Sequence, residues 1–245
     1  MRTCIFCGNQ ALTKEDAWPL WLVKLLKNKA GRIEATRGKQ ETKIWHVANP
    51  EIKVRHVCSN CNNGWMSDLE TRAKPIIEQL LGKDRLTLDA ASQGILAKWS
   101  VKNSMVFEAL RLSSSSFYVE VERRALKESL QLPSITSVWI AKSVKFESFF
   151  SKASDLEGII TASNNIVKSY VTTMGFGSLA IQVLCSKLPN LAGKNIAVDT
   201  DMNPEWEHAT LQIWPVRRQR VVWPPALGLS GEFGLESFSQ RWIQK

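Results

Sequence analysis

Two Cys-x-x-Cys pairs, separated by a long stretch of chain, restrict the fold of this protein more than any other feature of its sequence. Cys4 and Cys7 form the first pair, and Cys58 and Cys61 form the second. A gap of two residues lets both sulfurs of a tight turn reach one ion, and zinc binds four thiolates tetrahedrally at about 2.3 Å. The sequence therefore predicts one structural zinc ion that ties the two ends of a small N-terminal module together.

A redox dithiol is the rival interpretation of these cysteines. Thioredoxin-type sites use one pair beside a βαβ unit, whereas this chain has two pairs.

The chain begins Met-Arg-Thr-Cys without the apolar stretch of a secretory signal. We therefore expect a cytoplasmic protein, whose thiols stay reduced. The fifth cysteine, Cys185, lies in an apolar, strand-like run and is expected to be a buried free thiol.

The charge of the chain favours a polyanionic partner. The formal net charge is +9 and the isoelectric point is about 9.4, and residues 1–74 hold 13 basic and 7 acidic side chains. Lysine and arginine gain affinity for phosphate by releasing condensed counterions, so nucleic acid, in particular DNA, is the expected partner. A solvated basic face that only aids solubility is the alternative. No apolar run is long enough for a membrane helix, so no membrane contact is expected.

The pattern along the chain predicts an α+β protein in two regions. Residues 1–82 would form the zinc-binding module, with a short helix from Leu20 to Leu26 after Pro19. Residues 27–43 are polar and basic and predict a surface loop or hairpin, whose Arg32, Arg37 and Lys39 would contact phosphate. Two strand-like pieces follow between Ile44 and Val57, and a helix is expected from Asn63 onward.

Residues 83–245 are expected to form an α+β domain that supports the module or selects its substrate. Apolar residues recur at a helical period from Leu88 to Leu112 and predict a long amphipathic helix. Short strands are predicted at Phe117–Val121, Ser137–Ala141, Tyr170–Met174, Leu179–Leu184, Thr210–Trp214 and Arg220–Trp223.

The order of the motifs resembles bacterial HNH-endonuclease-like proteins of the His-Me finger group. The matching pieces are Cys4–Gly8, Leu12–Leu22 and Val57–Glu70, which lie in the first third of the chain. Weaker similarities follow at Trp99–Glu108 and in the Trp-Pro segments near the C-terminus. Phage endonuclease VII, which resolves Holliday junctions, is a distant relative with the same four-cysteine arrangement. The resemblance implies a zinc-stapled ββα-metal module and a role in conflict with mobile elements or phages.

The resemblance also implies a second metal ion and names its ligands. In the family, an acidic residue holds one divalent cation, and the asparagine after the last cysteine completes the site. By position, Glu15 would be the metal carboxylate and Asn62 the second ligand, with Asn63 as its substitute. A hard, oxygen-bound Mg²⁺ or Mn²⁺ can polarise the phosphate and stabilise the leaving oxygen when a base activates water.

The general base is where this sequence departs from the family. Asp16 stands at the position of the histidine, and an aspartate, with a usual pKa of about 3.9, is a poorer base at neutral pH than an imidazole at about 6.5. Three interpretations follow: a silent nucleic-acid-binding descendant, a site in which Glu15 and Asp16 share the metal differently, or an active-site variant made for study. As a fourth, His46 or His56 could replace the base; His208 lies far from the motifs.

The favoured function is therefore metal-dependent cleavage of nucleic acid, reduced or lost because of Asp16. The alternative is a non-catalytic zinc module that binds DNA or a protein partner. Gly175, Gly177 and Ala180 also match a dinucleotide fingerprint, with Asp199 near the expected offset, but no βαβ units surround them. Most of the ten tryptophans are expected in the core rather than on a base-stacking surface.

Overall fold

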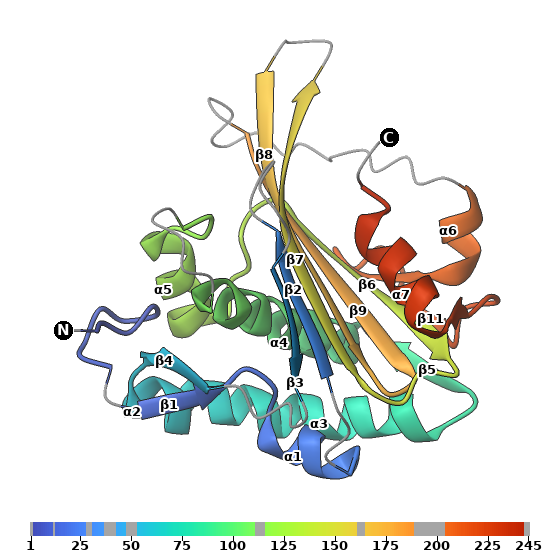
Figure 1. Cartoon of the computed structure of the whole chain (residues 1–245), viewed down its shortest axis with the longest axis horizontal. Coiled ribbons are helices and arrows are strands. Elements are labelled where there is room, and N and C mark those ends of the chain that lie inside the picture. Colours follow the sequence, from blue (N-terminus) through green and yellow to red (C-terminus); the bar gives the residue numbers. More distant parts are fainter. Residues whose placement is uncertain are drawn as a thin grey trace.

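A mixed β-sheet forms the centre of the chain in the computed structural model, which describes residues 2–11, 13–27, 31–36, 43–47, 53–110, 116–160, 165–188 and 204–242 (Figure 1). Its strands are β2 (Gly31–Thr36), β3 (Lys43–Val47), β6 (Thr136–Val144), β7 (Phe149–Ile160), β8 (Asn165–Phe176), β9 (Leu179–Lys187), β10 (Leu211–Trp214) and β12 (Leu229–Ser230). Among the described residues the order is β10-β6-β9-β8-β7-β2-β3, with β12 beside β6. The β2–β7 and β12–β6 pairs are parallel, and the others are antiparallel. The predicted α+β class is confirmed.

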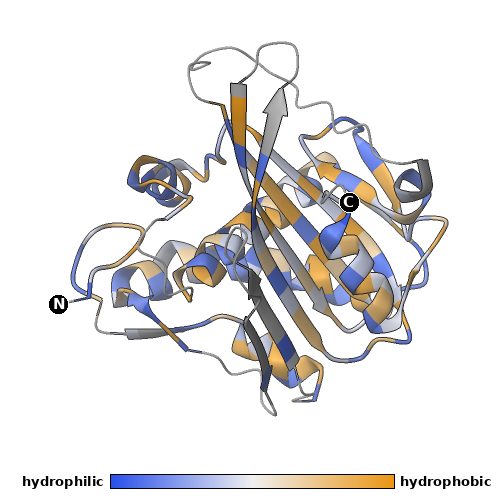
Figure 2. Cartoon of the chain, turned by 45° about the horizontal axis from the view of Figure 1, so that its top comes forward, coloured by the Kyte–Doolittle hydropathy of each residue, from blue (hydrophilic) through white to orange (hydrophobic). Residues whose placement is uncertain are grey.

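Helices cover both faces of this sheet. Helix α4 (Ala90–Ala109) lies on one face, and α6 (Pro204–Ala209) and α7 (Gly231–Gln240) lie on the other (Figure 1). Alternate residues of β6 divide between the two layers: Val138 and Ile140 share the core of α4, whereas Trp139 and Ala141 pack in the core that α7 completes. Both faces of the sheet therefore carry buried apolar side chains, and neither face is entirely polar (Figure 2).

Helix α4 corrects the prediction of an amphipathic helix over 88–112. Residues 86–89 instead form strand β5 (Leu86–Asp89), which pairs with β11 (Arg220–Trp223), and Asp89 caps the helix by accepting a hydrogen bond from the backbone N–H of Ser92 at 2.8 Å. Every residue from Trp99 to Glu108 is buried, polar ones included. This second half of the helix therefore has no solvent face, because the sheet and other helices surround it, whereas Ala91 near the start of the helix is exposed.

The strand predictions of the second region are largely confirmed, with one error. The predicted strand at Phe117–Val121 is wrong, because helix α5 (Glu120–Ser129) begins within it and the Glu122 carboxylate accepts a hydrogen bond from the Val119 N–H at 2.9 Å. The other five predicted strands lie within, or within one residue of, β6, β8, β9, β10 and β11. Strand β7 was not predicted.

The N-terminal part contains a two-stranded pair followed by helix. Its elements are β1 (Thr13–Asp16), α1 (Leu20–Leu25), β4 (Lys53–Val57), α2 (Ser59–Cys61), the π-helical turn η1 (Asn62–Met66) and α3 (Ser67–Gly82). Strand β1 pairs with β4 in antiparallel fashion. The predicted helix after Pro19, the two strands before Cys58 and the helix beyond Asn63 are confirmed.

The two predicted regions share one sheet and one core. The β2–β3 hairpin, which precedes residue 83, joins the large sheet through β7. Apolar side chains around the cysteines continue without a break through α3 and α4 to this sheet. The boundary at 82/83 remains a prediction. Strands β2 and β3, which precede this boundary, belong to the same sheet as the strands that follow it. No helix among the described residues is long and apolar enough to cross a bilayer.

Candidate functional site

The first cysteine pair lies in a tight turn at the N-terminus. The backbone N–H of Gly8 donates to the carbonyl of Cys4 at 2.9 Å, and the N–H of Cys4 donates to the carbonyl of Asn9 at 2.7 Å. Gly8 has a φ of +74°, which glycine adopts without the steric cost that a side chain would add. The sequence therefore turns back immediately after Cys7, and both sulfurs face the same side.

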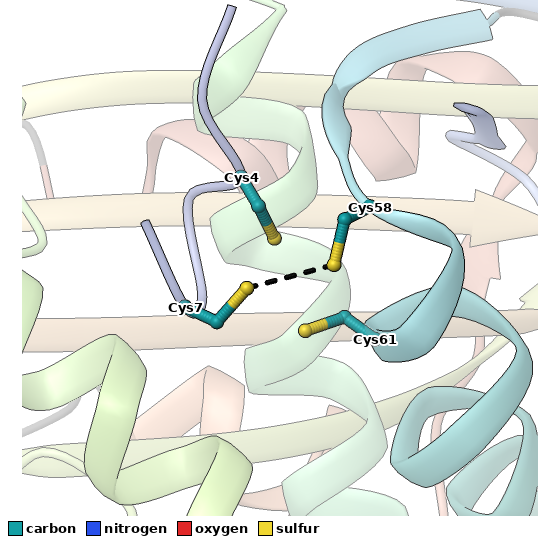
Figure 3. Close-up of side chains that lie close together, drawn as sticks. All are labelled: Cys4, Cys7, Cys58 and Cys61. Atoms are coloured by element: carbon teal, nitrogen blue, oxygen red, sulfur yellow. Dashed lines mark hydrogen bonds between the residues drawn. The ribbon is translucent and has the colours of Figure 1, made fainter. Parts of the chain in front are cut away.

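The second pair lies where β4 becomes helix, and the two pairs meet (Figure 3). Cys58 precedes the first residue of α2, Cys61 ends this short helix, and the N–H of Asn62 donates to the Cys58 carbonyl at 3.0 Å. The four sulfurs lie within 4.8 Å of one another, and the Cys7 and Cys58 Sγ atoms are 3.5 Å apart. Such a set of converging sulfurs could hold a metal ion, and four thiolates are the donors of structural zinc sites.

Contacts beyond the sulfurs hold the two pairs together. The Ile5 N–H donates to the His56 carbonyl at 2.9 Å, and the Phe6 and Trp65 rings meet edge to face with centroids 5.0 Å apart. Burial raises the pKa of the Cys61 thiol. Because metals bind the thiolate, a bound ion would displace protons from this cluster. Within the described part of the chain, the four cysteines are the one group of His, Cys, Asp or Glu ligands gathered closely enough to hold an ion.

Glu15 lies inside the molecule, next to a buried lysine. It is only 5% exposed, and its Oε1 lies 3.9 Å from the Nζ of Lys102 on α4. Lys102 is completely buried and donates a 2.7 Å hydrogen bond to Glu70 of α3. Burial raises the pKa of Glu15 to about 7; Lys102 opposes this rise, and the charge of Glu70 adds to it. The candidate metal carboxylate therefore belongs to a cluster of two carboxylates and one ammonium.

Asp16 lies on the opposite side of the strand from Glu15. The register sets Glu15 opposite Val54 and Asp16 opposite Lys53. Successive side chains of a strand point to opposite faces, so Glu15 turns inward while Asp16 turns toward solvent. There Asp16 forms an ion pair with Lys53, and both side chains remain partly exposed.

The candidate amide ligands lie in the turn after the last cysteine. Asn62 begins η1 and is half-buried, whereas Asn63 is exposed and donates its side-chain amide to Ser59 Oγ at 3.0 Å. The structure brings the four cysteines together as predicted. The metal roles of Glu15 and Asn62 and the role of Asp16 remain predictions.

The three histidines occupy different surroundings. His56 is half-buried on β4 between Val54 and Val57, where the register of the β1–β4 pair shifts, so simple alternation does not set its face. His46 is exposed on β3, which pairs with β2 in the large sheet. His208 is exposed near the end of α6. Of the three histidines, only His56 lies on β4, the strand that pairs with the strand of Glu15.

Sequence reasoning missed Lys102 and Glu70. Lys102 is the one charged residue in the run Trp99-Ser-Val-Lys-Asn-Ser-Met105, and a lone charge that becomes buried needs a partner. The sequence does not show that Glu15 and Glu70 are the partners, because each lies on a different element.

Of the three predicted phosphate contacts before β4, Arg32 lies among the described residues. Arg32 pairs with Glu232 of α7 at 2.6 Å. Arg37 and Lys39 lie outside the described residues. The phosphate contact of Arg32 remains a prediction, and its guanidinium already has a carboxylate partner.

The remaining motifs lie in the core or in a turn. Gly175 ends β8 with Phe176, Gly177 begins the turn and β9 follows, so no helix begins at this fingerprint. Asp199 lies outside the described residues. Cys185 is buried and receives a hydrogen bond from the Tyr118 hydroxyl at 3.3 Å, as expected of a structural thiol.

Comparison with known proteins does not assign this chain to a family. No family model, no curated protein and no solved structure matches it.

Proposed function

We propose that this chain is an HNH-like, metal-dependent nucleic-acid endonuclease whose activity is lowered by Asp16. The path of the chain around the cysteine cluster carries this proposal. Strands β1 and β4 pair antiparallel, and β4 runs through Cys58 directly into the helical segment α2, η1 and α3. Two strands followed by a helix, with Glu15 on the first strand and Asn62 at the start of the helix, are what a ββα-metal site requires.

Glu15 and Asn62 have the ligand chemistry of a hard divalent cation. Mg²⁺ prefers oxygen ligands, and it commonly keeps several waters beside one or two protein carboxylates. A bound Mg²⁺ or Mn²⁺ would polarise the phosphate and stabilise the leaving oxygen. Glu15 would supply the charged oxygen and Asn62 a neutral one. Zinc at the cysteines would hold the strand and the helix that carry them.

Asp16 accounts for the lowered activity. A carboxylate takes a proton from water less readily at neutral pH than an imidazole does. Proton transfer to Asp16 would also break its ion pair with Lys53. The water is therefore activated poorly, although the ligands of the cation are retained.

A second candidate, a non-catalytic zinc module that binds nucleic acid or a protein, is favoured by one specific observation. Both candidate catalytic carboxylates already have a lysine beside them: Asp16 pairs with Lys53, and Glu15 lies near Lys102. Carboxylates that are already paired with lysines attract a divalent cation less strongly.

Nicking of supercoiled plasmid DNA separates the two candidates. We expect the zinc-loaded chain to nick slowly with Mg²⁺ or Mn²⁺ and not at all with a chelator that spares the zinc. Glu15→Ala removes the charged ligand and should abolish this activity, while Glu128→Ala, which removes an exposed carboxylate on α5, should not. DNA binding without nicking, whichever cation is supplied, would support the binding module.

Binding to duplex DNA should weaken steeply as salt increases, because each phosphate contact releases counterions. Arg55 on β4 and Arg72 on α3 are exposed cations beside the candidate site. Reversing both charges should lower the slope of log affinity against log salt by about two.

Charge reversal at Arg217 and Arg218, exposed residues between β10 and β11, is the matched control for Arg55 and Arg72. An equal loss from both pairs would mean that only the total charge matters. Binding that ignores salt would point to a protein partner instead.

A further inference from the structure

Lys102 is an ammonium group with no contact with solvent. It lies in the middle of α4, with a side chain that is 0% exposed. Removing such a charge from water is costly unless other charges surround it. Its two acidic neighbours come from two other elements: Glu70 from α3 and Glu15 from β1. The Lys102 side chain thus links α4 to both α3 and β1.

Lys102 binds its two neighbours unequally. The 2.7 Å contact with Glu70 is a hydrogen bond, whereas the 3.9 Å separation from Glu15 Oε1 leaves only electrostatic attraction. No side chain or backbone group among the described residues donates a hydrogen bond to the Glu15 carboxylate. The lone pairs of Glu15 therefore remain open to another ligand while its position is held by a nearby charge.

The three groups carry a net charge of −1 when all are ionised. Without Lys102, two carboxylates would face each other in a buried space, and this charge of −2 would attract divalent cations more strongly. If Glu70 lost its charge, Glu15 would be the one negative charge left beside Lys102, and the ammonium would offset the charge of Glu15. The balance of these charges sets how strongly Glu15 can bind a cation.

We propose that Lys102 is a positioning residue, a built-in counter-ion that occupies Glu70 and leaves Glu15 free to bind a single divalent cation. This inference rests on the proposed function, because it assumes that Glu15 is the ligand. Lys102 acts through Glu15 and Glu70 and does not itself touch the reacting phosphate.

The proposal is tested by measuring the Mn²⁺ affinity of the zinc-loaded chain by electron paramagnetic resonance. The measurement is made at about pH 8, which lies above the pKa of Glu15. Lys102→Met removes a repelling charge near the cation and should tighten Mn²⁺ binding about tenfold. Glu70→Gln leaves the lysine to Glu15 and should weaken binding by a similar factor. The double variant restores the net charge of −1 and should return toward the parent value.

A purely structural lysine would give a different pattern. Both single variants would then lower thermal stability without moving Mn²⁺ affinity in opposite directions, and that result would overturn the proposal. Zinc content and circular dichroism report whether each variant is folded. If Lys102→Met does not fold, Glu70→Gln decides alone, because this variant keeps the size of the side chain and removes only its negative charge.

Glu15→Ala distinguishes failure of the inference from failure of the proposed function. If this variant loses Mn²⁺ binding but the Lys102 and Glu70 variants keep the parent affinity, Glu15 is the ligand and the role of Lys102 is wrong. If Mn²⁺ binding is unchanged by Glu15→Ala, the candidate cation site is itself wrong, and both proposals fall.

Discussion

Replacing Cys58 with serine should release the zinc and destabilise the whole chain. The parent protein should contain about one zinc per chain, and the variant close to none. Zinc binding in finger peptides is worth roughly 10 to 16 kcal/mol, as large as the entire stability of a typical domain, about 5 to 15 kcal/mol. The apolar core runs without a break from the cysteines through α3 and α4 to the large sheet. The loss should therefore lower the melting temperature of the chain as a whole.

Cys185→Ser is the matched control for this experiment. Cys185 is buried, but it lies far from the cluster in sequence and packs against Tyr118 and Thr136, whose hydroxyls a serine can also engage. This variant should keep its zinc. Elemental analysis and thermal unfolding under reducing conditions give the answer. A zinc-free parent protein that melts at the same temperature as the loaded one would contradict the structural role of the ion.

Replacing Asp16 with histidine should raise the rate of metal-dependent nicking by roughly 10² to 10⁴-fold, the usual contribution of a general base. Lys53 lies beside this position. A neighbouring cation disfavours the charged imidazolium, so the new imidazole would stay neutral and able to accept a proton from water. Single-turnover nicking with Mg²⁺ or Mn²⁺ measures the gain.

Two further variants identify the cause of any gain. Asp16→Asn also breaks the ion pair with Lys53 but supplies no base, and it should not accelerate nicking. Glu15→Ala combined with Asp16→His should abolish activity, because the charged cation ligand is lost. An unchanged rate in Asp16→His would mean that position 16, on the outer face of the strand pair, does not reach the reacting water.

A parent chain that already nicks rapidly would require another base. His56 would then be the residue to replace, since it is half-buried and lies on β4, the strand that pairs with the strand of Glu15. Loss of activity in His56→Ala would assign the role to it. If instead Asp16→His slows a rapid parent, Asp16 has a positive role, as a second carboxylate for the metal.

Local patterns in the sequence were sufficient for several elements. Pro19 and the apolar spacing after it predicted α1, and the turn residues beside the cysteines predicted that each pair would bend toward one ion. Alternating residues predicted β4, which delivers the chain to Cys58. These features depend on backbone preferences and spacing within a few residues, which a single sequence contains.

Patterns failed where burial depends on distant parts of the chain. The segment at Phe117–Val121 is strand-like in composition, but Val119 and Glu122 form a helix cap within it. Helix α4 has an apolar period, yet its polar residues from Ser100 to Glu108 are buried as well, since sheet and helices enclose this half of the helix. Hydrophobic periodicity predicts which side is apolar and does not show whether another layer covers the polar side.

Spacing and local pattern were enough to predict the four cysteines that could hold one ion and the strand and helix beside them. The resemblance to the His-Me finger group added that Asp16 stands where a base would be expected. The surroundings of the charged residues became known from the fold: Glu15 lies near Lys102, and Asp16 pairs with Lys53 on the other side of the strand. Arg32 pairs with Glu232. Ligand spacing is a property of neighbouring residues. The partner of a charge is chosen by packing between elements far apart in the chain, and the electrostatics of the candidate site are set there.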